Sequence, residues 1–498
     1  MSRALTSRRE CARPSIGLPN RDSWQDFFSR DLARHDPVSH DPVSHDPARQ
    51  VLARQVLAAA GQAVQVIRSV DVEAVLSSRT TILLTEGSSS SARQTLYNLD
   101  ATVDIVDPSP LCQCRFSSRI RKCYRCPHYS RDPAAYLRFL VKRIQEGKYD
   151  VLLPTHEQVY LLSYFRESFE RHVGLAVPEF DALQRMQSKV EFSRLMTELG
   201  LPTPRFQVVS HEADLDSISE YPCYLKLAHG TGGLGVERIE SLEQLKHAFA
   251  KFKRLGVVPD DAEVIVQQPA YGTPSVVQSV FQHGRLIAAH CSENRLVGLG
   301  GGQMFRESAK HDAVWPDLQH LGEKLRWHGP LFLEYFYHPE SGQVQYFEAN
   351  PRIGETVNAR LCGVNLCDLL VKISLGEQVA TALPTRPGVQ SHNGFQVLLA
   401  KAIGGANRRE LFAEAWRMMR HAGAYKGCEN ETTRPSEDLW SVIPATAVAL
   451  QLFVRPQLAP RIVESTIANY SLTEKGARLL ESLPKDLVDQ CFIEAGKG

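Results

Sequence analysis

The sequence predicts a protein of α/β and α+β class, in which a parallel α/β domain is followed by antiparallel hairpins and a helical C-terminal region. Strand-like and helix-like segments alternate between residues 80 and 185, which is typical of a parallel sheet covered by helices. Glycine turns separate apolar strands between 206 and 380, and helical patterns dominate after 390. We therefore predict four regions, 1–50, 51–185, 186–385 and 386–498, and a lid subdomain at about 205–270 within the third.

Composition and charge exclude several classes of protein. The 498 residues are enough for several domains, and 43% hydrophobic with 23% charged residues is typical of a globular protein. A net charge of +1 gives no indication of nucleic acid or an anionic membrane as partner. We find neither a membrane-spanning run nor a secretory signal, and so expect a cytoplasmic protein with free thiols among its 11 cysteines. A homodimer remains an open alternative.

The first 50 residues are predicted to be a disordered, low-complexity tail. They contain the repeat HDPVSHDPVSHDPARQ, whose Asp-Pro steps do not fit a helix interior and bring little to bury. The three His-Asp pairs that begin at His35 offer metal ligands as an alternative interpretation. The composition favours a flexible tail over a metal site.

The α/β pattern begins with a short apolar strand, Ile82 to Leu84, followed by a serine-rich turn and a helix. Further strands are predicted at 101–108, 150–155 and 173–178, with an amphipathic helix over 132–150. The turn after the first strand lacks the GxGxxG pattern, so it gives no case for a dinucleotide.

A cysteine- and arginine-rich segment, CQCRFSSRIRKCYRCPH, follows the second predicted strand. Its cysteines are spaced so that zinc is an open alternative, with the candidate ligands Cys112, Cys114, Cys123 and Cys126. Its arginines could instead meet an anionic substrate or face solvent: Arg115, Arg119, Arg121 and Arg125.

The next element is a helix within SKVEFSRLMTELGLPTP. Ser188 and Glu191 fit a capping box at its start, and the apolar residues that follow recur at helical spacing. Gly200 and Pro202 mark its end. The strand in CYLKLAHGTGGLGV then carries Lys226 into a glycine-rich turn over 230–235.

Such glycines allow backbone N–H groups to close over phosphates, with the lysine as a point charge beside them. A tight hairpin is the alternative. A further strand, in EVIVQQPAYG, ends at Gln267, Gln268, Pro269 and Ala270, where a nucleotide base could lie against the backbone.

The segment GPLFLEYFYHPESGQVQYFEANPR is predicted to be a hairpin. Its strands are Leu331 to Tyr337 and Gln343 to Ala349, so Glu348 and Asn350 share a face and Glu334 lies on the partner strand. Two carboxylates on adjacent apolar strands are costly unless a cation lies between them. Mg²⁺, which prefers oxygen ligands, fits this place, and Arg352 would reach a transferring phosphate. Two solvent-exposed glutamates are the disfavoured alternative, because their neighbours are apolar.

These pieces in this order resemble the ATP-grasp superfamily, over residues from about 80 to 380. The single-copy forms similar to the large subunit of carbamoyl-phosphate synthase and to carboxylate–amine ligases look nearest, because GGGQMFRESAKHD followed by the FLEYF strand is similar to theirs. The resemblance implies an ADP-forming ligase that makes a C–N bond. It would activate a carboxylate as an acyl phosphate and transfer it to an amine, with ATP and Mg²⁺ (or Mn²⁺) as cofactors.

The resemblance also implies roles for individual residues. Lys189 and Lys226 would contact ATP phosphates under a lid containing Gly232 and Gly233, and the adenine hinge would be Gln267, Gln268 and Ala270. Glu334, Glu348 and Asn350 would hold the metal, while Arg352 and Arg306 would act on the phosphoryl group and the substrate. Gln267 and Ser275 stand near positions where relatives often carry glutamates for the base and the ribose.

Two other functions remain open at this point. One is bicarbonate chemistry through carboxyphosphate or carbamoyl phosphate, and the other is a nucleotide-binding regulator without turnover. Intact Glu334, Glu348, Asn350 and Arg352 argue against the regulator. The substrates are expected to be small molecules, selected near Arg306 and Glu355 or by the cysteine- and arginine-rich segment.

Overall fold

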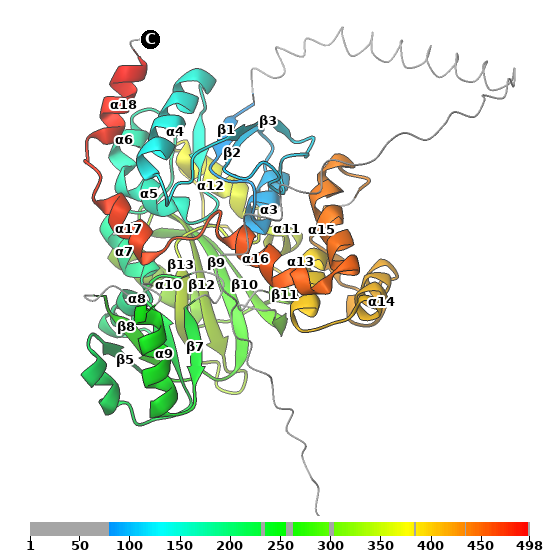
Figure 1. The fold of residues 1–498 in the computed structure, drawn as a ribbon. Helices are drawn as coiled ribbons and strands as arrows, with labels where there is room; N and C mark the ends of the chain where they lie inside the picture. Colours follow the sequence, from blue (N-terminus) through cyan, green and yellow to red (C-terminus); the bar gives the residue numbers. More distant parts are fainter. Residues whose placement is uncertain are drawn as a thin grey trace, which may run out of the picture. The chain divides into compact units, whose positions relative to one another are not determined.

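The computed structural model describes residues 79–230, 235–254, 262–297, 303–382, 385–433 and 435–496. All of them belong to one compact unit, Glu73–Gly498, drawn in colour in Figure 1. The predicted tail at 1–50 lies outside the described residues. Within the described ranges, no helix has both the length and the apolar character that a membrane span requires.

The N-terminal sheet is parallel, as predicted. Its strands run in the order β3-β2-β1-β4. They are β1 (Thr81–Leu84), β2 (Thr102–Asp107), β3 (Ile120–Arg125) and β4 (Val151–Leu153). The associated helices are α3 (Ser90–Asn98), α4 (Pro133–Gly147), α5 (Gln158–Tyr164), α6 (Arg166–Glu170) and α7 (Phe180–Gln187). The predicted amphipathic helix over 132–150 is therefore confirmed as α4.

The strand predicted at 173–178 is wrong. Among the described residues, this segment forms one isolated bridge, between Val151 and Gly174. Its apolar residues are buried because the chain passes close to another element: a Cβ at Gly174 would lie 2.5 Å from the carbonyl oxygen of Ser374. The fourth strand is instead β3, within the cysteine- and arginine-rich segment. An edge strand with polar side chains on both faces gives no apolar pattern to read.

The helix predicted after Ser188 is confirmed as α8 (Lys189–Glu198). The Ser188 hydroxyl accepts a hydrogen bond from the Glu191 N–H at 3.4 Å, and Gly200 ends the helix with a φ of 68°. The Lys189 N–H donates to the carbonyl of Ala228 at 2.9 Å. This bond holds the start of α8 beside the strand that enters the glycine turn.

A small antiparallel sheet lies within the segment at about 205–270, whose role as a lid stays a prediction. Its order is β5-β8-β6-β7, and α9 packs its apolar face on the sheet. The elements are β5 (Phe206–Val209), β6 (Cys223–Leu227), β7 (Val236–Ile239), α9 (Leu242–Arg254) and β8 (Val264–Gln267).

The central sheet has seven strands in the order β13-β12-β9-β10-β11-β14-β15. They are β9 (Thr273–Gln282), β10 (Arg285–Val297), β11 (Gln303–Ala309), β12 (Gly329–Tyr337), β13 (Val344–Asn350), β14 (Gln390–His392) and β15 (Glu429–Asn430). The predicted hairpin is confirmed as β12 and β13. The sheet also crosses the predicted boundary at 385, because β14 and β15 come from the region expected to be helical.

The remaining helices follow the central strands and fill most of the C-terminal region. They are α10 (Val314–Leu325), α11 (Val357–Leu361), α12 (Leu366–Ser374), α13 (Gly394–Ile403), α14 (Arg408–Met419), α15 (Ile443–Val454), α16 (Ala459–Ile467), α17 (Glu474–Glu481) and α18 (Leu487–Ala495). Leu480 of α17 and Val488 of α18 are buried in the same core as α4, and Figure 1 shows α18 beside α4.

The apolar helix α15 is only partly covered by its neighbours. Leu452 is the buried residue of that fully described helix, whereas Leu450 and Val454 are 59% and 58% exposed. The apolar side chains surround α15 on all sides, and its described neighbours α13 and α14 cover only part of it.

A buried histidine of the central sheet predicts acid sensitivity. His290 in β10 contacts Asn358 Oδ1 at 2.8 Å and Thr385 Oγ1 at 3.1 Å, and burial lowers the pKa of its imidazole to about 4. In the unfolded chain His290 has a pKa of about 6.5 and becomes protonated below that pH. In the folded protein it stays neutral down to about pH 4. The contribution of neutral His290 to the free energy of unfolding is therefore complete above about pH 6.5, and it is about 2 kcal/mol smaller at about pH 5.

Urea unfolding near pH 7 and pH 5 measures this loss, and His290→Gln should remove about 2 kcal/mol of the difference. His247→Gln, on the exposed face of α9, is the control and should keep the full pH dependence. An unchanged pH dependence in His290→Gln would contradict the assignment.

Candidate active site

The hairpin β12–β13 brings two carboxylates together. Glu334 lies directly opposite Glu348 in the register, and the Asn350 Nδ2 group donates to Glu334 Oε1 at 3.3 Å. Lys189 Nζ lies 3.1 Å from Glu348 Oε1. Glu348 and Asn350 therefore share a face of the hairpin, as their spacing in the sequence predicts, and Glu334 lies beside them on the partner strand.

The electrostatics of this pair favour a cation. Burial, followed by the negative charge of Glu348, raises the pKa of Glu334 well above that of a free glutamate. Carboxylate oxygens that crowd one another in this way suit a divalent metal ion with oxygen ligands. Asn350 Oδ1, which accepts from Arg352 Nη2 at 2.9 Å, is a third oxygen at the same place. The residues present thus fit Mg²⁺.

Two lysines border the carboxylates. Lys226 Nζ donates to Gln267 Oε1 at 2.6 Å and lies 5.1 Å from the centre of the Phe347 ring. Burial lowers the pKa of Lys226 to about 8. Lys189 Nζ also donates to the carbonyl of Gly230 at 2.9 Å, at the start of the predicted glycine lid. Gly232 and Gly233 lie outside the described residues.

The predicted hinge is only partly joined to this cluster. The Gln267 side chain is buried and turned toward Lys226. The Gln268 N–H donates to Arg205 O at 2.8 Å and its Nε2 donates to Glu220 O at 3.2 Å, so Gln268 points away from the cluster. Ala270 follows in a partly exposed loop, and Ser275 is buried with its hydroxyl donating to Thr273 O at 3.0 Å. Their roles toward a base and a ribose stay predictions.

Arg352 is oriented by a residue that sequence reasoning missed. Its Nε donates to Glu157 Oε1 at 3.1 Å, and Gln187 Nε2 donates to Glu157 Oε2 at 2.6 Å. Glu157 follows the carboxyl end of β4, and polar residues at that end of a parallel strand are a recognisable signal. The neighbouring His156 packs on Tyr470 with ring centres 3.9 Å apart. Tyr470 carries no comparable signal in its surrounding sequence.

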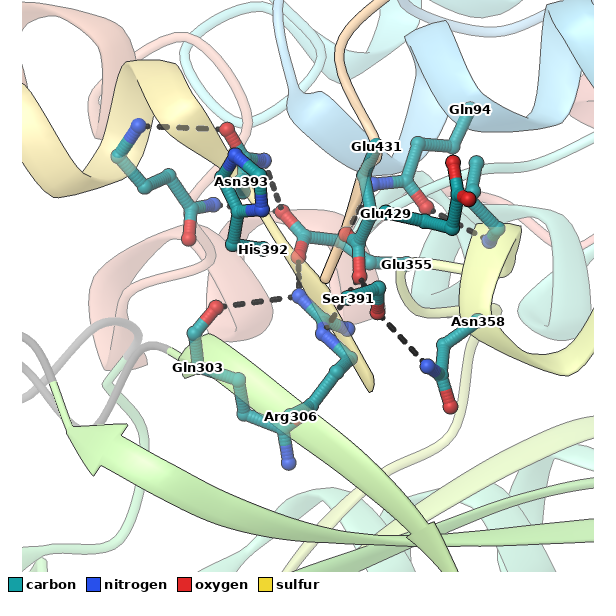
Figure 2. A network of polar contacts seen from close by, with 12 residues as sticks. Gln94, Gln303, Arg306, Glu355, Asn358, Ser391, His392, Asn393, Glu429 and Glu431 are labelled. Atoms are coloured by element: carbon teal, nitrogen blue, oxygen red, sulfur yellow. Dashed lines mark hydrogen bonds and ion pairs between the residues drawn. The ribbon is translucent and has the colours of Figure 1, made fainter. Parts of the chain in front are cut away.

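Arg306 belongs to a second polar network, which Figure 2 shows from close by. Its guanidinium pairs with Glu355 and, at 2.9 Å, with Glu431. Glu431 also accepts from Ser391 at 2.6 Å and from Gln94 Nε2 at 3.0 Å, so five distant segments meet here. The predicted contact of Arg306 with a substrate stays a prediction, since its buried guanidinium already has two carboxylate partners.

The structure gives the zinc alternative no support. Cys112 and Cys123 lie 3.8 Å apart between their sulfur atoms. Nevertheless, no group of three or more His, Cys, Asp or Glu side chains in the described part of the chain is arranged to hold a metal ion. Arg121 in the same segment donates to both carboxylate oxygens of Asp104, at 3.0 and 2.9 Å, which is a structural pairing.

Comparisons with known proteins agree with this geometry. No protein-family model matches the chain. It is 23% identical over 219 residues to a carbamoyl-phosphate synthase of Methanobrevibacter smithii, a match that covers 40% of this chain and 56% of the relative. The chain thus spans about half the length of this curated relative.

Two solved structures have a similar fold. The biotin carboxylase domain of Hydrogenobacter thermophilus 2-oxoglutarate carboxylase, in complex with MgADP and bicarbonate, matches with a TM-score of 0.51 and 14% identity over 63% of this chain and 73% of that one. An ADP complex of N5-carboxyaminoimidazole ribonucleotide synthetase matches with a TM-score of 0.51 and 16% identity over 69% of this chain and 88% of that one. With the parallel sheet and the paired glutamates of the central sheet, these matches show that the chain has the ATP-grasp fold.

Proposed function

We propose that the chain is an ATP-dependent, ADP-forming ligase that activates a carboxylate as an acyl phosphate and transfers the acyl group to an amine. The observation that carries this proposal is the cluster of Lys189, Lys226, Glu334, Glu348 and Arg352 beside Gly230. Facing carboxylates, two buried lysines and an oriented arginine are what phosphoryl transfer requires, because catalysis there is positioning and charge neutralisation.

Each side chain has a definite place in the proposed reaction. Glu334, Glu348 and Asn350 would hold Mg²⁺, which neutralises charge on the phosphates when bound. Lys189 and Lys226 would contact the phosphates from the side of the glycine turn. Arg352, fixed by Glu157 and Asn350, directs its guanidinium to the phosphoryl group as the carboxylate attacks the γ-phosphorus. The glycine lid and the hinge at Gln267, Gln268 and Ala270 would enclose the nucleotide and keep water off the acyl phosphate.

ADP release over a matrix of small acids and amines, with mass spectrometry of the products, tests the proposal. A product containing one acid and one amine, formed with one ADP, is the expected result. ATP binding without ADP release across the whole matrix would support the nucleotide-binding regulator instead.

Bicarbonate chemistry is the second candidate, and the comparisons favour it specifically. The curated relative is a carbamoyl-phosphate synthase, and the biotin carboxylase structure is a complex with MgADP, ADP and bicarbonate. ADP release that requires bicarbonate and no other acid would select this function. The cluster around Arg352 serves both candidates, because carboxyphosphate is itself an acyl phosphate.

The proposed function predicts that ATP affinity depends on pH. The Lys226 ammonium has a pKa of about 8 in the free protein, below its ordinary value of 10.5, because burial disfavours its charge. Bound phosphates favour the charged form, so ATP affinity is complete below about pH 8 and weakens by up to about tenfold per unit above it. Calorimetry near pH 7, 8 and 9 should show this loss together with proton uptake.

Lys226→Met is the matched variant, since methionine keeps the length of the side chain and has no charge to lose. It should bind ATP more weakly at every pH and show no proton uptake near pH 8.5. The same pH dependence in wild type and variant would assign it to another group.

A further inference from the structure

One face of the central sheet is polar across five strands, from the paired glutamates to Arg306. The register pairs Asn350 with Phe332, Phe332 with Gln278, and Gln278 with His290. Four residues further along the same strand and on the same face, Asn294 pairs with Arg306, which pairs with Ser391. Cross-strand partners lie on the same face, so Gln278 lies between the phosphoryl cluster and the Arg306 network.

Glu355 stands at the junction of these two groups. One of its oxygens pairs with Arg306 (Figure 2), and the other accepts from Gln396 Nε2 at 2.5 Å and from Asn393 Nδ2 at 3.4 Å. Its side chain remains 12% exposed, a fraction similar to those of Arg352 at 11% and Glu348 at 20%. All three charged side chains therefore keep some contact with solvent.

A buried amide oxygen points to the ligand that this place suits. Gln278 is 3% exposed, and its Nε2 donates to the backbone carbonyl of Glu355 at 2.6 Å. Its Oε1 has no hydrogen-bond partner among the described residues, and it would lie 2.9 Å from a Cβ placed on Gly354. The free acceptor thus lies over the turn between Arg352 and Glu355, and an unpartnered acceptor is costly unless a ligand donates to it.

We infer that Glu355 and Gln278 bind the nucleophile of the reaction, and that it arrives as a protonated primary amine. Both groups are acceptors, so they would bind an ammonium group and repel a carboxylate. This inference rests on the proposed function, which names an amine but assigns it no binding site and no protonation state. It places the amine beside Arg352, where the acyl phosphate would form.

The protons balance in the proposed step. The ammonium gives one proton to the Glu355 carboxylate, and the exposed lone pair of the amine attacks the acyl carbon. A C–N bond forms and the bond from the acyl carbon to the phosphate oxygen breaks. The second N–H proton leaves with phosphate, which departs as hydrogen phosphate.

The first test compares a protonated amine with hydroxylamine, which is uncharged near pH 7.5, as acceptors for the full chain with ATP, Mg²⁺ and the best acid. In Glu355→Gln, kcat/KM for the amine relative to hydroxylamine should fall by about tenfold or more, corresponding to one lost charge contact. Glu355→Asp should recover part of this ratio. Glu307→Gln removes a carboxylate from the Arg295 pair on the same strand as Arg306 and should leave the ratio unchanged. Equal losses with both nucleophiles would overturn the inference and indicate a structural role.

The second test needs no turnover and separates the inference from the proposed function. Thermal unfolding is followed with ethylammonium chloride against tetramethylammonium chloride, which has no N–H donor, at equal ionic strength. A rise in Tm specific to ethylammonium that is lost in Glu355→Gln and in Gln278→Met, but kept in Glu307→Gln, is expected. If no acid supports ADP release, the proposed function fails while this result upholds the amine site. An identical response to both salts in the wild type would overturn the amine site.

Discussion

Replacing Arg352 by alanine is expected to lower kcat for ADP release by about 10³-fold and to change the Kd for ATP by less than about threefold. The guanidinium is held by Glu157 at 3.1 Å and by Asn350 at 2.9 Å, so its orientation exists before substrate binds. Such a donor acts on charge that develops during transfer, whereas Lys189 and Lys226 would provide ground-state contacts to ATP. Steady-state kinetics and calorimetric ATP titration measure the two effects separately.

Two further variants sharpen this prediction. Glu157→Gln keeps the side-chain volume but weakens the orientation of Arg352, so it should lower kcat by a smaller factor, about tenfold. Arg166→Ala is the control, because Arg166 also pairs with glutamates. Its partners are Glu170 and Glu179, which do not belong to the phosphoryl cluster. It should leave kcat unchanged. ATP affinity and turnover falling by the same factor in Arg352→Ala would contradict the proposed role.

The residues that could be assigned from the sequence lie within short, regular segments. Period-2 alternation along β12 and β13 placed Glu348 and Asn350 on one face, with Glu334 on the partner strand, whereas the direct pairing of Glu334 with Glu348 depends on a register shift between Glu334 and Tyr335. The helix after Ser188 was equally clear, because its cap, apolar spacing and glycine end all agree. Both cases depend on contacts between residues close in sequence or joined by one tight turn.

The missed residues depend on contacts between distant segments. Glu157 reaches Arg352 across 195 positions, and Gln94 reaches Glu431 across 337. Nothing local to Glu431 or Tyr470 distinguishes them from other polar residues of a helical region. The β3 strand was missed for a related reason, since an edge strand needs no apolar face and so leaves no periodicity.

Glu334→Gln is expected to stabilise the metal-free protein while it abolishes turnover. Burial and the facing Glu348 raise the pKa of Glu334, which means that its charge is disfavoured in the folded state. A neutral amide of the same size removes the repulsion, so the free energy of unfolding in EDTA should rise by about 1 kcal/mol. The same change removes a proposed metal ligand, and kcat with MgATP should fall by at least about 10²-fold.

The opposite signs of these effects separate a functional carboxylate from a structural one. A glutamate retained for stability would lose stability and activity together when changed to glutamine. Glu340→Gln, in the exposed turn of the same hairpin, is the matched control and should leave both measurements unchanged. Chemical denaturation in EDTA, repeated with MgATP, should also show that the ligand stabilises Glu334→Gln less than the wild type, because the metal has one oxygen ligand fewer. Lower stability of Glu334→Gln in EDTA would show that the pair is held together without a cation, and the metal assignment would then be wrong.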